Sequence, residues 1–86
     1  PVIFTESGWP TMSNGPMIPE ETTEAFQKKY LDEIIPWSMK QKITMFIFEA
    51  FDEPWKGSNQ PDEPEKHWGI YNVKRQPKTW AKDFFK

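Results

Sequence analysis

The sequence ITMFIFEAFDEPWK, at residues 43–56, joins a nearly unbroken apolar run to a cluster of charged side chains. Residues 43–48 are apolar except for Thr44, a pattern typical of a strand buried on both faces in a parallel sheet that helices cover. Four charged residues follow the run within eight positions: Glu49, Asp52, Glu53 and Lys56. Because α/β proteins carry their functional groups at the carboxyl ends of parallel strands, the sequence predicts a site directly after this strand.

A second strand end repeats this arrangement near the start of the sequence. Residues 2–5 form a short β-branched and aromatic run, and Glu6 follows it directly in the sequence TESGWP. Gly8 allows a tight backbone there, and Pro10 fixes the direction in which the chain leaves the strand. Two parallel strands would therefore bring acidic side chains, each with a tryptophan nearby, to the same edge of a sheet.

Helical patterns are expected after each of the two strands. Pro19 suits the first turn of a helix, and the apolar residues that follow recur at helical spacing: Phe26, Tyr30, Leu31 and Ile34. Pro36 is expected to end or kink this helix at the preceding residue. A long loop over residues 50–66 then leads to a final helix after Pro77. The predicted order of elements makes two consecutive βα units.

The composition limits the size of the fold and the kind of partner. A length of 86 residues allows one small domain, and a net charge of -2 argues against nucleic acid as a partner. No apolar run approaches the ~18 residues needed to cross a membrane, so no membrane partner is predicted. The single His lacks the ligand spacing of a metal site, and neither a metal nor another cofactor is expected.

Two strands do not complete a sheet. An apolar strand such as residues 43–48 needs a neighbour on each side, and the predicted helices cannot cover both of its faces. The chain is therefore expected to be a piece of a larger sheet or barrel, or a protomer that completes itself by self-association.

The residues around Glu6 indicate carbohydrate chemistry. Trp9 offers a flat ring on which a sugar can stack, and an ionised carboxylate beside it can attack an anomeric carbon or stabilise positive charge there. The alternative interpretation is that Glu6 is a solvated residue at a strand end, which is the commoner role of a lone glutamate.

The second acidic cluster admits the same two interpretations. Its carboxylates either form an acidic loop held away from the core or belong to a site. Lys56 favours a site, because a nearby cation keeps carboxylates ionised. Trp55 is a second candidate sugar platform, whereas Trp68 is expected to serve packing. From the residues alone, Glu6 and Glu53 are the candidate pair of carboxyl groups.

Three motifs in order, TESGWP, FEAFDEPWK and EKHWGIY, resemble the closing quarter of glycoside hydrolase family 17. These are retaining beta-1,3-glucanases and glucanosyltransferases of fungi, bacteria and plants. The resemblance covers nearly the whole chain and implies an α/β fold, the (β/α)8 TIM barrel. Residues 1–86 would supply its last two βα units, from strand seven to the final helix, with no second domain.

The resemblance also implies roles for single residues. Glu6 matches the catalytic nucleophile, whereas the family's acid/base, at the end of strand four, has no counterpart in this chain. Asp52 stands where plant members tend to carry Asn. The residues expected to bind substrate or to support the nucleophile are Trp9, Glu49, Asp52, Glu53, Trp55, Lys56 and Glu65.

These implications favour part of a retaining beta-1,3-glucan hydrolase or transglucosylase, which works through a covalent glycosyl-enzyme intermediate. Its expected partners are a beta-glucan oligo- or polysaccharide and either the N-terminal part of the barrel or a second copy of the chain. Activity is expected of the full barrel, and the resemblance favours a secreted or cell-wall protein. The alternative is a non-catalytic fragment that binds beta-glucan or serves assembly.

Overall fold

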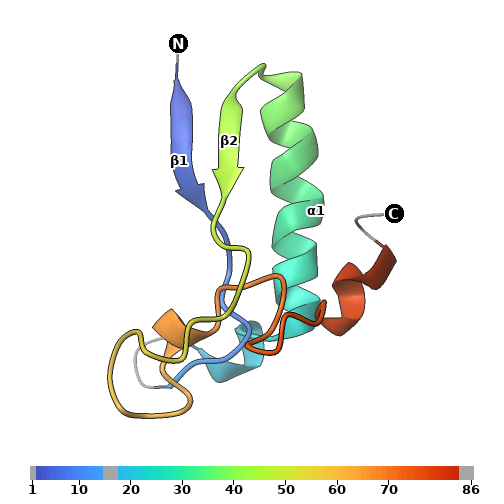
Figure 1. Cartoon of the computed structure of the whole chain (residues 1–86). Coiled ribbons are helices and arrows are strands. Elements are labelled where there is room, and N and C mark those ends of the chain that lie inside the picture. Colours follow the sequence, from blue (N-terminus) through green and yellow to red (C-terminus); the bar gives the residue numbers. More distant parts are fainter. Residues whose placement is uncertain (1, 15–17, 84–86) are drawn as a thin grey trace.

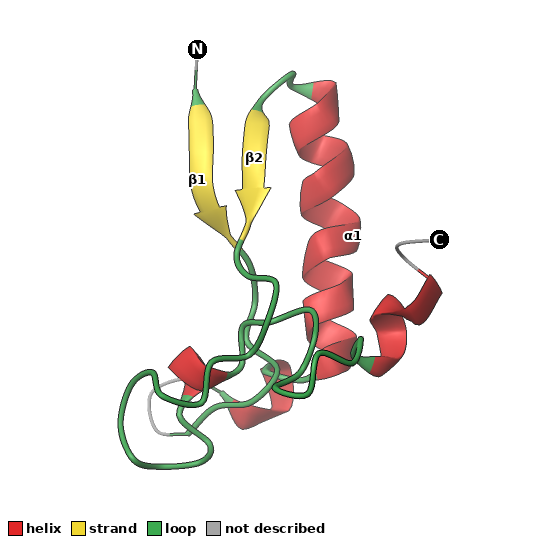
Figure 2. Ribbon diagram, viewed as in Figure 1, coloured by secondary structure: helices red, strands yellow, loops and turns green. Residues whose placement is uncertain are grey.

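Two short parallel strands stand beside one long helix, and loops gather beyond the carboxyl ends of the strands (Figure 1, Figure 2). The computed structural model describes residues 2–14 and 18–83. The strands are β1 (Ile3–Ser7) and β2 (Thr44–Ile47), and the helix is α1 (Glu24–Lys40). Three short 3-10 turns complete the regular elements: Pro19–Glu21, Pro64–Lys66 and Thr79–Asp83.

The strands β1 and β2 pair in parallel, as the two βα units predict. Phe4 lies opposite Met45 and Ser7 lies opposite Ile47, so three residue steps on β1 match two on β2. This irregularity falls on the segment that holds Glu6, and β1 extends two residues beyond the predicted strand. Bulges of this kind change the direction of a side chain at the end of a strand.

The helix α1 begins where Thr23 caps it, because Thr23 Oγ1 accepts a hydrogen bond from the Phe26 N–H at 3.2 Å. Pro19 belongs to a separate 3-10 turn, so its predicted place in the first turn of this helix is wrong. The helix also continues through Pro36 to Lys40, which corrects the predicted end. Pro36 is exposed, and water can reach the carbonyl that loses its N–H partner there.

The buried apolar core is small and lies between α1 and the segments at the carboxyl ends of the strands. Its buried members are Leu31, Ile70 and Ala81, and six partly buried residues pack around them: Tyr30, Ile34, Ile35, Ile47, Tyr71 and Trp80. Ile3 and Phe46, on the strands, remain 55% and 59% exposed. The prediction that the strand is buried on both faces is therefore not fulfilled within this chain. The described residues contain only two strands and one long helix, which is too little to cover both faces of the sheet.

The long loop after β2 folds back on a buried lysine. Lys66 Nζ donates to the carbonyl oxygens of Pro54 at 3.0 Å and Lys56 at 2.5 Å. His67 Nε2 lies 2.7 Å from the Pro61 carbonyl oxygen. The loop therefore has an internal framework of its own, supplied by side chains at its far end.

The C-terminal segment forms a 3-10 helix at Thr79–Asp83, so over the described residues the final helix predicted after Pro77 is a 3-10 helix, not an α-helix, and the rest of that prediction lies outside the described residues. The segment packs on α1 through Ala81 and Trp80 of the apolar core, and two hydrogen bonds also tie it there. The Thr79 N–H donates to Glu24 Oε1 at 2.7 Å, and Trp80 Nε1 donates to a glutamine of α1. Over residues 2–14 and 18–83, no helix is long and apolar enough to span a membrane.

Candidate active site

Glu6 lies near the carboxyl end of β1 and borders a hollow of about 220 Å³. The other residues that line it come from the ends of both strands and from the loop after β2: Ser7, Phe48, Glu65 and Trp68. We call this cavity the Glu6 hollow. Glu6 is exposed, so a ligand in the hollow can reach its carboxylate. The structure thus brings together Glu6 and Glu65, two of the residues that the sequence singles out.

The two strand ends approach each other closely beside Glu6. The Phe48 N–H donates to the Ser7 carbonyl oxygen at 2.8 Å, and Ser7 Oγ lies 2.5 Å from the Tyr30 hydroxyl of α1. A Cβ atom added at Gly8 would lie 1.8 Å from the Phe48 carbonyl oxygen. Only glycine permits this approach, so Gly8 fixes the backbone that follows Glu6.

A second group of charges, Glu49, Glu53 and Lys56, follows β2. Lys56 forms an ion pair with Glu53, and its Nζ lies 3.6 Å from Glu49 Oε1. The same ammonium lies 4.6 Å from the centroid of the Phe48 ring, a cation–π contact. Because Phe48 also lines the Glu6 hollow, this contact links the two groups. No three His, Asp or Glu side chains of the described residues are arranged to hold a metal ion.

The three charges of this second group titrate differently. Burial, together with the hydrogen bond and negative charge of Glu53, raises the pKa of Glu49 to about 7. The hydrogen bond from Lys56 lowers the pKa of Glu53, and the same hydrogen bond raises the pKa of Lys56. Near neutral pH, Glu53 is therefore ionised, whereas Glu49 is partly protonated.

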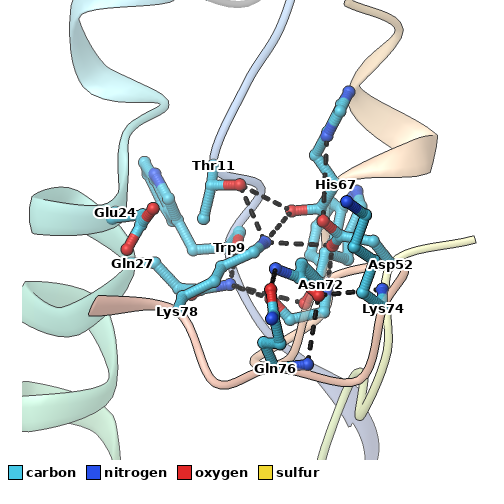
Figure 3. Close-up of polar contacts among 12 residues, drawn as sticks. Trp9, Thr11, Glu24, Gln27, Asp52, His67, Asn72, Lys74, Gln76 and Lys78 are labelled. Atoms are coloured by element: carbon cyan, nitrogen blue, oxygen red, sulfur yellow. Dashed lines mark hydrogen bonds and ion pairs between the residues drawn. The ribbon is translucent and has the colours of Figure 1, made fainter. Parts of the chain in front are cut away.

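Asp52 is buried and turned toward the interior. Its Oδ1 accepts hydrogen bonds from the Gly69 N–H at 2.8 Å and from Lys78 Nζ at 2.9 Å, and its Oδ2 lies 3.9 Å from His67 Nδ1 (Figure 3). Lys78 Nζ also donates to Thr11 Oγ1 at 2.8 Å and to the His67 carbonyl oxygen at 3.3 Å. The structure thus gives Asp52 backbone and lysine partners and places it outside the Glu6 hollow.

Gln27 is a second buried polar residue beside this ion pair (Figure 3). Its Nε2 donates to the carbonyl oxygens of Trp9 at 2.9 Å, Gly69 at 3.1 Å and Trp68 at 3.4 Å. Its Oε1 accepts a hydrogen bond from Trp80 Nε1 at 2.8 Å. One side chain of α1 therefore holds two separate backbone segments, at Trp9 and at Trp68–Gly69, and the indole of Trp80.

Sequence reasoning missed Gln27 and Lys78. A signal existed for Gln27, which interrupts the apolar stripe between Phe26 and Tyr30, because a polar group on a buried face needs hydrogen-bond partners. Lys78 carries no such signal, since a single lysine near other lysines is normally solvated.

The two tryptophans expected to bind sugar lie outside the Glu6 hollow. Trp9 stacks on Tyr30 of α1, with the ring centroids 5.4 Å apart. Trp55 is 75% exposed and borders a separate hollow of about 390 Å³ in the loop after β2. Trp68, which the sequence assigns to packing, is the tryptophan that borders the Glu6 hollow.

The sequence matches a known family over almost its whole length. The model of the family described as Glycosyl hydrolases family 17 matches residues 1–82. The chain belongs to this family. The resemblance inferred from the three motifs is therefore confirmed.

Curated relatives of this family 17 chain include fungal glucosidases. A glucan 1,3-beta-glucosidase of Arthroderma benhamiae is 35% identical over 85 residues, which cover 90% of this chain and 26% of the relative. A glucan 1,3-beta-glucosidase of Saccharomyces cerevisiae is 32% identical over 72 residues, covering 77% of this chain and 21% of the relative. The chain thus spans about a quarter of the length of these relatives.

Solved structures of related enzymes contain the same arrangement of elements. An endo-laminarinase from Formosa superposes with a TM-score of 0.82 at 31% identity, covering 93% of this chain and 21% of the other. An active-site mutant of Rhizomucor miehei beta-1,3-glucanosyltransferase, solved in complex with laminaritriose, gives a TM-score of 0.77 at 28% identity, covering 92% and 27%. The chain has a partial α/β fold that recurs within larger family 17 enzymes.

Proposed function

We propose that this family 17 chain is the nucleophile-bearing part of a retaining beta-1,3-glucan hydrolase or transglucosylase. The observation that carries the proposal is that Glu6, at a strand end, borders a hollow also lined by Glu65 and Trp68. In a (β/α)8 barrel, β1 and β2 would be strands seven and eight, followed by α1 and by the C-terminal segment. The names of the relatives and the laminaritriose complex of one of them support beta-1,3-glucan as the substrate class.

The first step is the formation of a glycosyl ester on Glu6. A carboxylate oxygen of Glu6 attacks the anomeric carbon, and the bond from that carbon to the leaving glucosyl oxygen breaks. The leaving oxygen takes a proton from a carboxylic acid supplied from outside these 86 residues. Exposure of Glu6 to the hollow suits this step, because the attacking oxygen must reach the sugar.

The second step releases the sugar with its original anomeric configuration. Water, or a hydroxyl group of another glucan, gives a proton to the same external carboxylate and attacks the anomeric carbon. The ester bond breaks and Glu6 returns to its ionised form. Water as acceptor makes the enzyme a hydrolase, and a sugar acceptor makes it a transglucosylase.

The group Glu49, Glu53 and Lys56 supports this site through its electrostatics. Lys56 sits over Phe48, one of the residues that line the Glu6 hollow, so it places positive charge next to that hollow. Glu53 holds Lys56 in place through their ion pair. We assign Trp55 and Trp9 to sugar binding beyond the reacting unit, since both border hollows of their own.

The kinetics of two variants of the full-length enzyme test the proposal. Glu6→Gln should lower kcat by at least about 1,000-fold on laminari-oligosaccharides while substrate still binds, because the amide cannot form the ester. Glu53→Gln is the matched control, since it makes the same chemical change at a supporting residue. It should cost about 10- to 100-fold, shared between kcat and KM, the equivalent of one charged hydrogen bond. A Glu6→Gln enzyme with near-normal kcat would refute the assignment.

A further inference from the structure

Lys78 holds the backbone on both sides of Trp68. Its Nζ donates directly to the His67 carbonyl oxygen, one residue before the tryptophan. It also pairs with Asp52 Oδ1, which accepts from the Gly69 N–H, one residue after the tryptophan. The Lys78 ammonium group therefore holds the peptide unit before Trp68 directly and the peptide unit after it through Asp52 (Figure 3).

The backbone of Trp68 itself is fixed from two further directions. Its carbonyl oxygen accepts from the Glu49 N–H at 3.1 Å, at the end of β2, and from Gln27 Nε2 of α1 at 3.4 Å. Gly69 has no room for a side chain, because a Cβ atom there would lie 2.2 Å from the Asp52 backbone nitrogen. These contacts hold the turn that carries Trp68 in one conformation, and Lys78 packs against the buried side of this turn.

The side chain of Trp68 leaves this turn toward the Glu6 hollow. Its ring packs edge-on against Phe48, with centroids 6.0 Å apart, and both rings line the hollow. Glu65 lies three residues earlier on the same segment and borders the same hollow. A shift of the turn would therefore move the wall that faces the nucleophile.

We infer that Lys78 is a positioning residue for the reaction at Glu6: through the His67 carbonyl and Asp52 it fixes the turn that sets Trp68 in the Glu6 hollow. This inference rests on the proposed function. Lys78 does not touch the hollow itself, so it acts only through the residues that it holds.

The presence of a buried ion pair between Lys78 and Asp52 supports the positioning role of Lys78. Lys78 and Asp52 are both buried, and burial lowers the pKa of Lys78 while the Asp52 carboxylate opposes that change. A buried ion pair contributes little net stability compared with apolar packing, but it fixes geometry because each partner must keep its hydrogen bonds. Lys78 makes three such bonds, each to a different segment of the chain.

The test uses the full-length enzyme with Lys78→Met and Asp52→Asn combined, so that neither charge is left buried alone. We expect kcat on laminari-oligosaccharides to fall about 10- to 100-fold, because a displacement of about 1 Å near the reacting centre can cost about 100-fold. KM should change by less than kcat, because Lys66 rather than Lys78 holds the Pro54 and Lys56 carbonyl oxygens on either side of Trp55, although His67 also lines the Trp55 hollow. The Gly69 amide should exchange with solvent faster than in the wild type.

Leu31→Ala is the control for a general loss of stability. Leu31 is buried in the apolar core and its side chain has no polar group that could join the hydrogen bonds of the ion pair, so this variant should lose stability yet keep kcat at a temperature where it is folded. A folded double variant with kcat within about two-fold of the wild type, or with unchanged exchange at Gly69, would overturn the positioning role. Failure of the wild-type enzyme to turn over beta-1,3-glucan would instead overturn the proposed function, before any variant is compared.

Discussion

Replacing Glu49 by glutamine should change how stability depends on pH. The pKa of Glu49 is raised from 4.5 to about 7, mainly by burial, so the folded state holds its proton more tightly than the unfolded state does. Stability therefore falls as pH rises from about 4.5 to about 7 and levels off above that. At about 1.4 kcal/mol for each pH unit, the ionisation of Glu49 costs at most about 3 kcal/mol at high pH.

Glutamine resembles the protonated form of this side chain and does not ionise. At pH 5 the wild type and Glu49→Gln should have similar free energies of unfolding, whereas at pH 8 the variant should be the more stable by up to about 3 kcal/mol. Urea unfolding of the full-length enzyme, followed by tryptophan fluorescence at both pH values, measures this difference. The pKa of Glu53 is lowered, so its own contribution is lost only as pH falls below its ordinary range, which separates the two effects.

Glu33→Gln serves as the control for Glu49→Gln, because it removes one formal charge from an exposed position on α1. The reasoning fails if the stability difference between the wild type and Glu49→Gln is the same at pH 5 and pH 8.

Three further predictions follow from exposed or crowded positions. Trp55→Ala should weaken binding of laminari-oligosaccharides by about 1 kcal/mol, or roughly five-fold in Kd by titration calorimetry, and an unchanged Kd would leave Trp55 without a sugar-binding role. Gly8→Ala should destabilise the protein by at least about 2 kcal/mol in denaturant, because its Cβ would collide with the Phe48 carbonyl oxygen, and a neutral effect would contradict the close strand approach. The 86-residue chain alone should self-associate or unfold with low cooperativity, because Ile3 and Phe46 stay exposed; a monomer by light scattering with a sharp thermal transition would contradict this.

The sequence predicted the elements whose patterns are local. The apolar run before Glu49 identified β2, the run before Glu6 identified β1, and parallel pairing follows from the helix between them. The helix was predicted in the right place, but both of its ends were wrong. It begins after the Thr23 cap and not at Pro19, and it continues through Pro36 because that proline lies on an exposed face.

The directions in which the loop side chains point could not be predicted from the sequence. Asp52 and Glu53 are neighbours, yet one points into the interior and the other pairs with Lys56 near the surface. That difference depends on Lys78, which lies 26 residues further along the chain. In the same way, Trp68 reaches the Glu6 hollow because distant residues hold its turn.

Rescue by azide tests the central assignment most directly. A full-length enzyme with Glu6→Ala has space for azide where the carboxylate stood, and azide can then attack the anomeric carbon of an aryl beta-laminarioside from the same side. The product expected is a glycosyl azide of inverted, alpha configuration, identified by nuclear magnetic resonance, because a single displacement replaces the two steps of the retaining mechanism. If azide instead rescues Glu53→Ala with inversion and leaves Glu6→Ala inactive, Glu6 is not the nucleophile.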